Sequence, residues 1–177
     1  MVVDATAQIG VVMTVIHKVL LVLAFVYGFF SFSYAGKDVE RIKKVIKIYN
    51  NIVIQESKTD RHRDLRTFVK MMEDVTTENV ARKLYIWIQS WHENGLFMDS
   101  KILKLKFLDI KINGEKAKAI TEENWKYKYF DRRINKIVVP ETDIFYKVEY
   151  NLIRNKNRWI ISKIKVLEEK KDQEGKR

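Results

Sequence analysis

Histidine, the side chain most often used for acid–base chemistry and metal binding, is scarce in this chain: there are 3 histidines in 177 residues. His62 lies within the charged run 60–64, and His92 follows Trp91 close to the end of an expected helix. Neither has a second histidine one helical turn away, the spacing of a helical zinc site. Cysteine is absent, so there is no thiolate nucleophile and no cysteine-based zinc site. We therefore predict no metal, no cofactor and no catalytic residue.

One carboxylate and three tyrosines on expected strands are the remaining candidates for acid–base chemistry. They are Asp109, Tyr127, Tyr146 and Tyr150. A lone carboxylate among tyrosines is more often part of a hydrogen bond at the edge of a core, so we expect these residues to be structural.

Aromatic and basic residues alternate in the region from Trp125 to Val166. Strand geometry places Lys126 and Lys128 on the face opposite Trp125 and Tyr127, so phosphate contacts and base stacking would not occur together. We therefore expect no nucleic-acid partner. The aromatic face is predicted to line a cavity or an interface, through Trp125, Tyr127, Tyr129, Tyr146, Tyr150 and Trp159. The basic face is predicted to meet an anionic surface or only solvent, through Lys104, Lys106, Lys116, Lys118, Lys126 and Lys128.

The overall charge agrees with an anionic partner or surface. Lysine and arginine outnumber aspartate and glutamate by 34 to 23, a formal net charge of +11. Such an excess attracts anions in general and does not choose between polymers, lipids and proteins. The length fits one ordinary domain, with a core that needs no disulfide or metal.

Residues 1–35 are expected to form a signal peptide. Lys18 precedes an apolar run over residues 19–32, and Ser33 and Ala35 are small residues at the positions that signal peptidase reads. We predict cleavage after Ala35, and we take Met13 as the biological start. If the segment stays uncleaved, residues 19–34 serve as a membrane anchor. In either case the folded part is expected to be exported, periplasmic or extracellular.

Three amphipathic helices follow. Their apolar stripes are Val39, Ile42, Val45, Ile46, Tyr49, Ile52 and Val53; then Leu65, Phe68, Val69 and Met72; then Val80, Leu84, Trp87, Ile88 and Trp91. Thr59 and Asp60 are the expected cap of the second helix. Gly95 is the expected stop of the third, because glycine adopts the left-handed conformation at low cost.

Antiparallel strands follow the helices. We expect strands over 102–112, 116–129, 144–152 and 159–166, with a type I′ hairpin at Asn113-Gly114 and a turn at residues 155–157. Residues 102–112 alternate imperfectly, which indicates a bulge or burial on both faces. Residues 131–140 are expected to form a loop, and the charged tail from Glu168 to be solvated or disordered. Helices followed by an antiparallel meander predict an α+β fold, with the helices on one face of the sheet.

This order of elements resembles the NTF2-like cone fold. More narrowly, several runs resemble the IMS domain of the ARC6-like family, an NTF2-like module of plastid and cyanobacterial division proteins. The runs are Trp91–Phe97, Leu105–Ala119, Thr121–Trp125, Val148–Leu152 and Trp159–Ile161. The resemblance places one NTF2-like domain over residues 36–167, with a flexible tail over residues 168–177.

The resemblance implies a non-enzymatic domain that binds another envelope protein or a second copy of itself. Two alternatives share the fold. A cone cavity can carry a small molecule or lipid, and some NTF2-like proteins are isomerases or dehydratases that use an acid or base in the cone. A deep pocket with a buried carboxylate would favour the enzyme, and an open apolar cavity would favour the carrier.

Overall fold

The computed structural model describes residues 36–59 and 63–171. The chain divides into two units, residues 1–39 and 40–177, and the second contains the whole sheet. The predicted signal peptide, His62 and the cap candidate Asp60 lie outside the described residues. None of the helices within the described ranges is long and apolar enough to cross a membrane.

Three helices are present among the described residues, as the apolar stripes predicted. The first covers residues 36–58, and α2 (Leu65–Met72) and α3 (Glu78–His92) follow it. The cap of α2 is Asp64, whose side chain accepts a hydrogen bond from the backbone N–H of Thr67 at 2.8 Å. Thr59 is not the cap, because its hydroxyl donates to Gln55 O at 3.2 Å inside the preceding helix.

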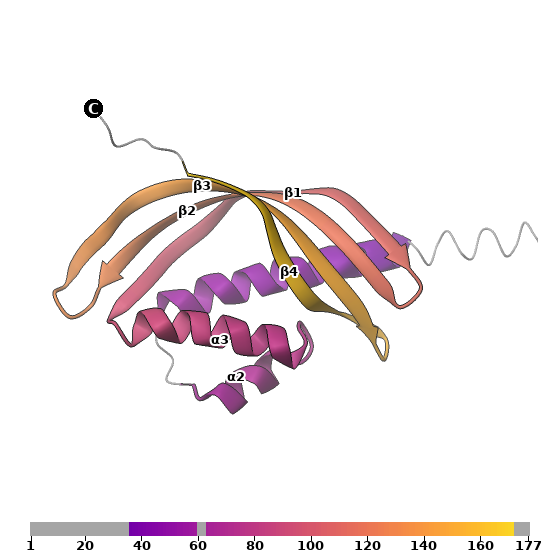
Figure 1. Cartoon of the computed structure of the whole chain (residues 1–177), viewed down its shortest axis with the longest axis horizontal. Helices are drawn as coiled ribbons and strands as arrows, with labels where there is room; N and C mark the ends of the chain where they lie inside the picture. The colour runs from indigo at the N-terminus through magenta and orange to yellow at the C-terminus, as the bar shows by residue number, and fades with distance from the viewer. Residues whose placement is uncertain (1–35, 60–62, 172–177) are drawn as a thin grey trace, which may run out of the picture. The chain divides into compact units, whose positions relative to one another are not determined.

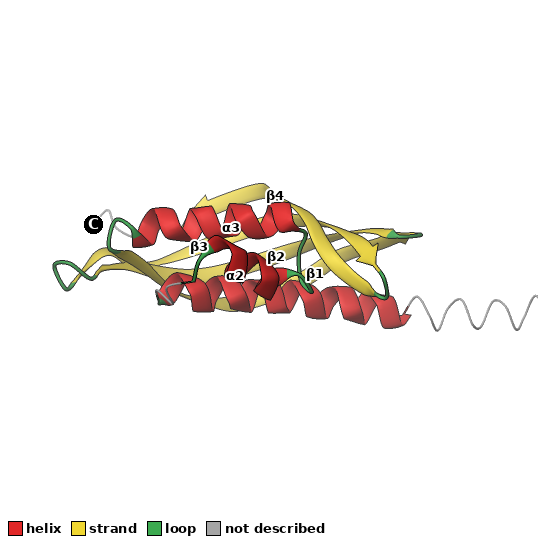
Figure 2. Cartoon of the chain, turned by 90° about the horizontal axis from the view of Figure 1, so that it is seen from below, coloured by secondary structure: helices red, strands yellow, loops and turns green. Residues whose placement is uncertain are grey.

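Four strands form one antiparallel sheet in the order β1-β2-β3-β4. They are β1 (Leu96–Asn113), β2 (Lys116–Asp131), β3 (Lys136–Asn155) and β4 (Arg158–Lys171). The sheet arches over the helices, which lie together on its concave side (Figure 1 and, from below, Figure 2). The predicted α+β class and the placement of the helices on one face are thus confirmed.

The imperfect alternation in β1 is explained by two irregularities in its pairing with β2. The register shifts between Ile102 and Lys104 and again between Phe107 and Asp109. Each shift leaves one leucine out of the ladder, and both leucines are exposed: Leu103 at 51% and Leu108 at 38%. Each extra residue reverses which positions of the strand face the core. Core-facing side chains are therefore at even-numbered positions before the first irregularity, at odd-numbered positions between the two, and at even-numbered positions after the second.

All four strands are longer than the sequence indicated, and β3 and β4 include residues that were predicted to lie outside strands. Residues 131–140 are not one loop, because Lys136 to Pro140 belong to β3 and the turn covers only residues 132–135. Pro140 lies at an irregularity in the pairing of β2 with β3, where the register shifts between the pairs Tyr127↔Thr142 and Tyr129↔Val139. At such an irregularity proline, which has no backbone N–H, does not have to donate a hydrogen bond to the neighbouring strand. The tail prediction was also wrong at its start, since Glu168 to Lys171 pair with β3.

The turns explain which glycines the chain needs. Gly95, three residues after the last residue of α3, has a φ of +71°, so the predicted left-handed stop is confirmed. The first hairpin has residues 114 and 115 in its turn, with positive φ at Gly114 (+56°) but not at Glu115. A type I′ turn needs positive φ at both positions, so the predicted turn type was wrong although the hairpin is present.

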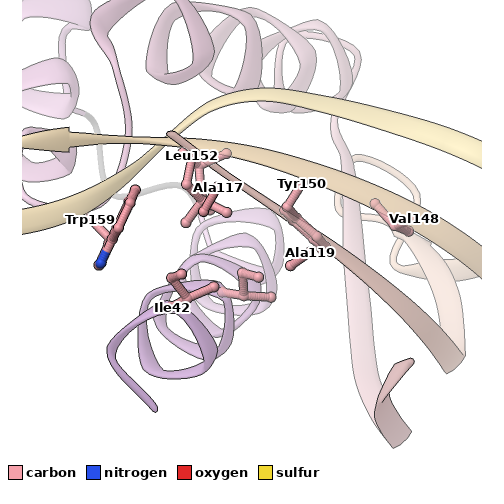
Figure 3. Packing of buried hydrophobic residues seen from close by; sticks show 9 residues of the cluster. Ile42, Ala117, Ala119, Val148, Tyr150, Leu152 and Trp159 are labelled. Atoms are coloured by element: carbon pink, nitrogen blue, oxygen red, sulfur yellow. The ribbon is translucent and has the colours of Figure 1, made fainter. Parts of the chain in front are cut away.

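The core lies between the concave face and the helices. Ile42 and Ile46 are fully buried against Ala117, Ala119 and the aliphatic residues of β3 and β4. Figure 3 shows the two small alanines of β2 facing the helix, which lets its backbone approach the sheet closely. A second cluster, which includes Phe68, Met72, Leu84 and Ile88, joins α2 and α3 to the first helix.

Backbone hydrogen bonds fix α3 at one edge of the sheet. Thr77 N donates to Ile161 O at 2.9 Å, and Ile161 N donates to Val75 O at 2.8 Å. These bonds hold the turn before α3 against β4, and they fix the position of the N-terminal end of α3 relative to the sheet.

Candidate functional site

A groove lies between the helices and the concave face of the sheet. It consists of two adjoining cavities of about 490 Å³ and 750 Å³. Val53, Trp87, Trp125, Tyr146 and Glu169 line both of them, and we call the two together the aromatic groove. Its size is that of a site for a small ligand or for a side chain and its neighbours.

Six of the fifteen residues that line the smaller cavity are aromatic, and α3, β2 and β3 supply them. Trp87 and Trp91 come from α3, one helical turn apart, and Tyr127 and Tyr129 come from alternate positions of β2. Trp91 and Tyr129 pack with ring centroids 4.8 Å apart, which closes one wall. Trp87 remains 39% exposed at the mouth, so the apolar wall continues to the surface.

Five of the six predicted lining residues lie in this groove. Trp125, Tyr127, Tyr129 and Tyr146 line the smaller cavity, and Tyr150 lines the larger one. The sixth, Trp159, is 1% exposed and lies in the core, with the Arg154 guanidinium 4.6 Å from its ring centroid.

Glu123, which lines the larger cavity, is a carboxylate only 2% exposed. Its Oε1 accepts hydrogen bonds from Thr121 Oγ1 (2.7 Å) and Tyr150 OH (2.8 Å), and its Oε2 accepts one from Trp125 Nε1 (2.9 Å). Within the described residues, Glu123 has no cationic partner. Hydroxyl, phenol and indole donors therefore compensate its burial in place of an ion pair.

The same cluster shifts the acidity of its tyrosines. Burial, reinforced by the Glu123 carboxylate, raises the pKa of Tyr49 and of Tyr150 well above the usual value. Burial and then the Glu169 carboxylate raise the pKa of Tyr146 to about 12. The Glu169 and Glu123 carboxylates thus both act on Tyr146, although the chain as a whole is strongly basic.

Three side chains that line the groove, those of Asn50, Trp91 and Ser100, each have a buried polar atom without a hydrogen-bond partner among the described residues. Asn50, 3% exposed, has an unpaired Nδ2, and its Oδ1 lies 3.2 Å from Tyr150 OH, whose single proton is directed to the closer Glu123 carboxylate. Ser100, 8% exposed, has an unpaired Oγ in the smaller cavity. Unpaired buried groups are rare in proteins, and all three of these side chains line a space that a ligand can enter.

Asp109 does not lie in the groove. It pairs with Ile120 on the convex side, with its carboxylate 3.3 Å from Lys111 Nζ. The carboxylate of the concave face is Glu123, which was not among the predicted site residues. Its parity was the available signal, since it shares a strand and an odd number with Thr121 and Trp125.

His92 has an ordinary structural environment. Its Nε2 lies 3.2 Å from Ser57 O, and its ring stacks on Phe97 with centroids 4.4 Å apart. Throughout residues 36–59 and 63–171, no group of three or more histidine or acidic side chains is placed to hold a metal ion.

The predicted basic face lies on the convex side, but acids neutralise much of it. Four of its six lysines form ion pairs: Lys106 with Glu122, Lys118 with Glu149, Lys126 with Glu141 and Asp143, and Lys128 with Asp99. Lys104 and Lys116 have no such partner among the described residues. A surface of paired charges attracts anions less than the row of lysines suggests.

No protein-family model matches the sequence. No curated protein matches it either. The chain has the fold of a solved structure. Its fold matches the "intermembrane space region of chloroplast protein ARC6" with a TM-score of 0.60 and 16% sequence identity. The alignment covers 71% of this chain and 93% of that one. The resemblance to the ARC6-like IMS domain is therefore confirmed as a distant likeness of fold.

Proposed function

We propose that the chain is an exported, non-enzymatic binding domain of the cell envelope that holds another protein in the aromatic groove. The observation that carries this proposal is the groove itself, walled by Trp87, Trp125 and Tyr146 and open to the surface. Aromatic side chains in a concave site are the usual anchors of protein recognition.

The mouth of the groove supports a protein partner. Trp87, Val138 and Val166 line the groove and are 39%, 43% and 54% exposed. Exposed apolar side chains gathered around a cavity mark a surface that another molecule covers. The partner is another envelope protein or a second copy of this chain.

The likeness of fold supports the same assignment. The matching part of ARC6 is its intermembrane space region, and the proposal places this chain, too, outside the membrane. As part of the proposal we assign the domain to the NTF2-like superfamily, since a curved antiparallel sheet covers three helices as in the NTF2-like cone.

Crosslinking and pull-down from the native host test the binding role. We compare the wild type with Trp87→Glu in the groove, and with Leu103→Glu on a bulge of β1 as the matched control. The proposal predicts one or more crosslinked proteins that Trp87→Glu loses and Leu103→Glu keeps. Identical crosslinks in all three proteins would show that the groove is not the binding site.

Mass spectrometry of the mature protein tests export. The proposal predicts an N-terminus at Gly36, or an intact segment 19–34 in the membrane fraction. A chain in the cytosol that retains residues 1–35 would rule out export.

A small-molecule or lipid carrier is the second candidate, and the cavity volumes favour it. Cavities of about 490 Å³ and 750 Å³ with aromatic and aliphatic walls are within the range of ligand sites. Mass spectrometry of the purified protein under non-denaturing conditions separates the candidates: a carrier retains a small ligand that Trp87→Glu releases, whereas a protein-binding domain shows the mass of the chain alone.

A further inference from the structure

The charges of the aromatic groove point to the chemistry of the group that enters it, and this inference rests on the proposed binding function. Two carboxylates belong to the groove: Glu123 at its buried floor and Glu169, which lines both cavities. Neither forms an ion pair within the described part of the chain. A domain with an excess of lysine and arginine thus leaves two acids unpaired at one site, which indicates that a cation arrives from outside.

Glu123 has room for one further donor. A carboxylate has about four acceptor positions, and Glu123 uses two on Oε1 and one on Oε2. The unused position is on Oε2, the oxygen that accepts from the Trp125 indole, and both residues line the larger cavity. An ammonium N–H is a suitable donor for that position, and its positive charge supplies the counter-charge that Glu123 lacks.

The walls suit the same group. Trp87, Trp125 and Tyr146 line both cavities, and Tyr49 and Tyr150 complete the larger one. The faces of tryptophan and tyrosine attract cations, and aromatic walls around a carboxylate are the usual device for holding an alkylammonium group. The alkyl part of such a ligand gains in addition from apolar contact with Val53 and Val148.

The rim has the opposite charge. Lys83 and Lys163 line the larger cavity and Lys171 lines the smaller one; all three are exposed, and none is paired with an acid among the described residues. A simple cation is repelled by these lysines, whereas acidic groups beside the cation are attracted to them. The ligand that matches the whole site is therefore cationic at its centre and anionic on both sides.

We propose that the partner is an acidic segment of another protein that inserts one lysine side chain into the aromatic groove. The lysine ammonium contacts the Glu123 carboxylate between Trp87, Trp125 and Tyr146, and Glu169 faces it from the mouth. Acidic residues of the segment, next to the lysine, pair with Lys83 and Lys163. Asn50 Nδ2, which has no acceptor among the described residues, is available to donate to a carbonyl oxygen of the segment.

Peptide titration tests the proposal on the purified protein with an intact fold. The probes are the blocked peptide Ala-Asp-Lys-Glu-Ala and its analogue with norleucine in place of lysine, which keeps the alkyl chain and lacks the charge. Binding is followed by the indole N–H signals of Trp87 and Trp125 in NMR spectra. We expect the lysine peptide to bind roughly tenfold more tightly than the norleucine peptide.

Two variants show whether the carboxylates cause that preference. Glu123→Gln removes the charge with little change of shape, and Glu169→Gln does so at an exposed position where folding is not at risk. Each is expected to weaken the lysine peptide several-fold and to leave the norleucine peptide within about twofold. Lys104→Gln, on the convex side, is the control and changes neither.

The outcomes separate this proposal from the proposed function. Equal binding of the two peptides, or an equal loss of both in the Glu123 and Glu169 variants, overturns the lysine assignment. If neither peptide shifts the indole signals, the assignment is wrong as well. In each case the groove remains a binding site if native crosslinks still depend on Trp87, and the binding function itself fails if they do not.

Discussion

Replacing Tyr150 with phenylalanine removes one hydroxyl from the polar cluster around Glu123 and leaves the ring in place. That hydroxyl lies 2.8 Å from Glu123 Oε1 and 3.2 Å from Asn50 Oδ1, with the tyrosine 2% exposed. A hydrogen bond to a charged group contributes about 1.5–3 kcal/mol. No cavity forms, because the ring still packs against Tyr49, 6.3 Å away between centroids. We predict a loss of about 2 kcal/mol in the free energy of unfolding, with a fall in Tm of roughly 4–8 °C.

Urea unfolding of wild type and variant measures this loss. Tyr127→Phe is the matched control, because the Tyr127 hydroxyl has no hydrogen-bond partner among the described residues and its side chain is only half-buried. We expect a change below about 0.5 kcal/mol there. Combining Tyr150→Phe with Glu123→Gln should reveal a coupling of about 0.5–3 kcal/mol. Equal losses at the two tyrosines, or additive effects of the two changes, would refute the account of the cluster.

Three further predictions concern pH, the core and the turns. Burial and Glu123 raise the pKa of Tyr49 and of Tyr150, so above about pH 10 these tyrosines lose their protons in the unfolded chain while they keep them in the folded chain. The free energy of unfolding should therefore fall above about pH 10, by up to roughly 1.4 kcal/mol per pH unit for each tyrosine. Urea unfolding at several pH values should show that Tyr150→Phe removes the contribution of one tyrosine to this fall. Ile46→Ala, at a site 0% exposed, should cost about 2–5 kcal/mol, whereas Ile48→Ala, 38% exposed on the same helix, should cost less than about 1 kcal/mol by chemical denaturation. Gly95→Ala should lower Tm more than Gly114→Ala. Both positions have positive φ, but of the two only Gly95 has a side chain close to the new Cβ, at 2.6 Å. Equal Tm shifts for the two variants would contradict this prediction.

The sequence predicted the class of the fold because its apolar residues recur at regular helix or strand spacing wherever only one face of the element is buried. The helical stripe of Ile42 and Ile46 and the alternation of β2 both indicated the faces that are buried. Prediction failed where the chain departs from a period. Leu103 and Leu108 each add a residue to β1, and Pro140 lies at an irregularity of β3 that a simple strand pattern excludes. Glu168 to Lys171 were predicted to be a solvated tail because they are all charged. They belong to an edge strand that pairs with a neighbour along one side only, and such a strand needs few apolar residues.

The candidate site was predictable in its aromatic part and not in its polar part. Trp125 and Tyr127 follow strand alternation, so their common face could be read directly. Glu123 was overlooked because a carboxylate in a polar run is normally exposed. Its burial depends on Tyr150, 27 residues away in the chain, and a partner at that separation is not evident from local pattern. Trp159 was assigned to the aromatic face by type alone, and the first helix covers it.

Site-specific photo-crosslinking in the native host tests the central claim, that the aromatic groove is the binding site, most directly. A photo-reactive amino acid replaces Trp87 at the mouth of the groove in one variant and Leu103 on the β1 bulge in another. If the aromatic groove is the binding site, position 87 gives a discrete crosslinked protein and position 103 gives none. A crosslink from position 103 alone, with position 87 silent, would contradict it.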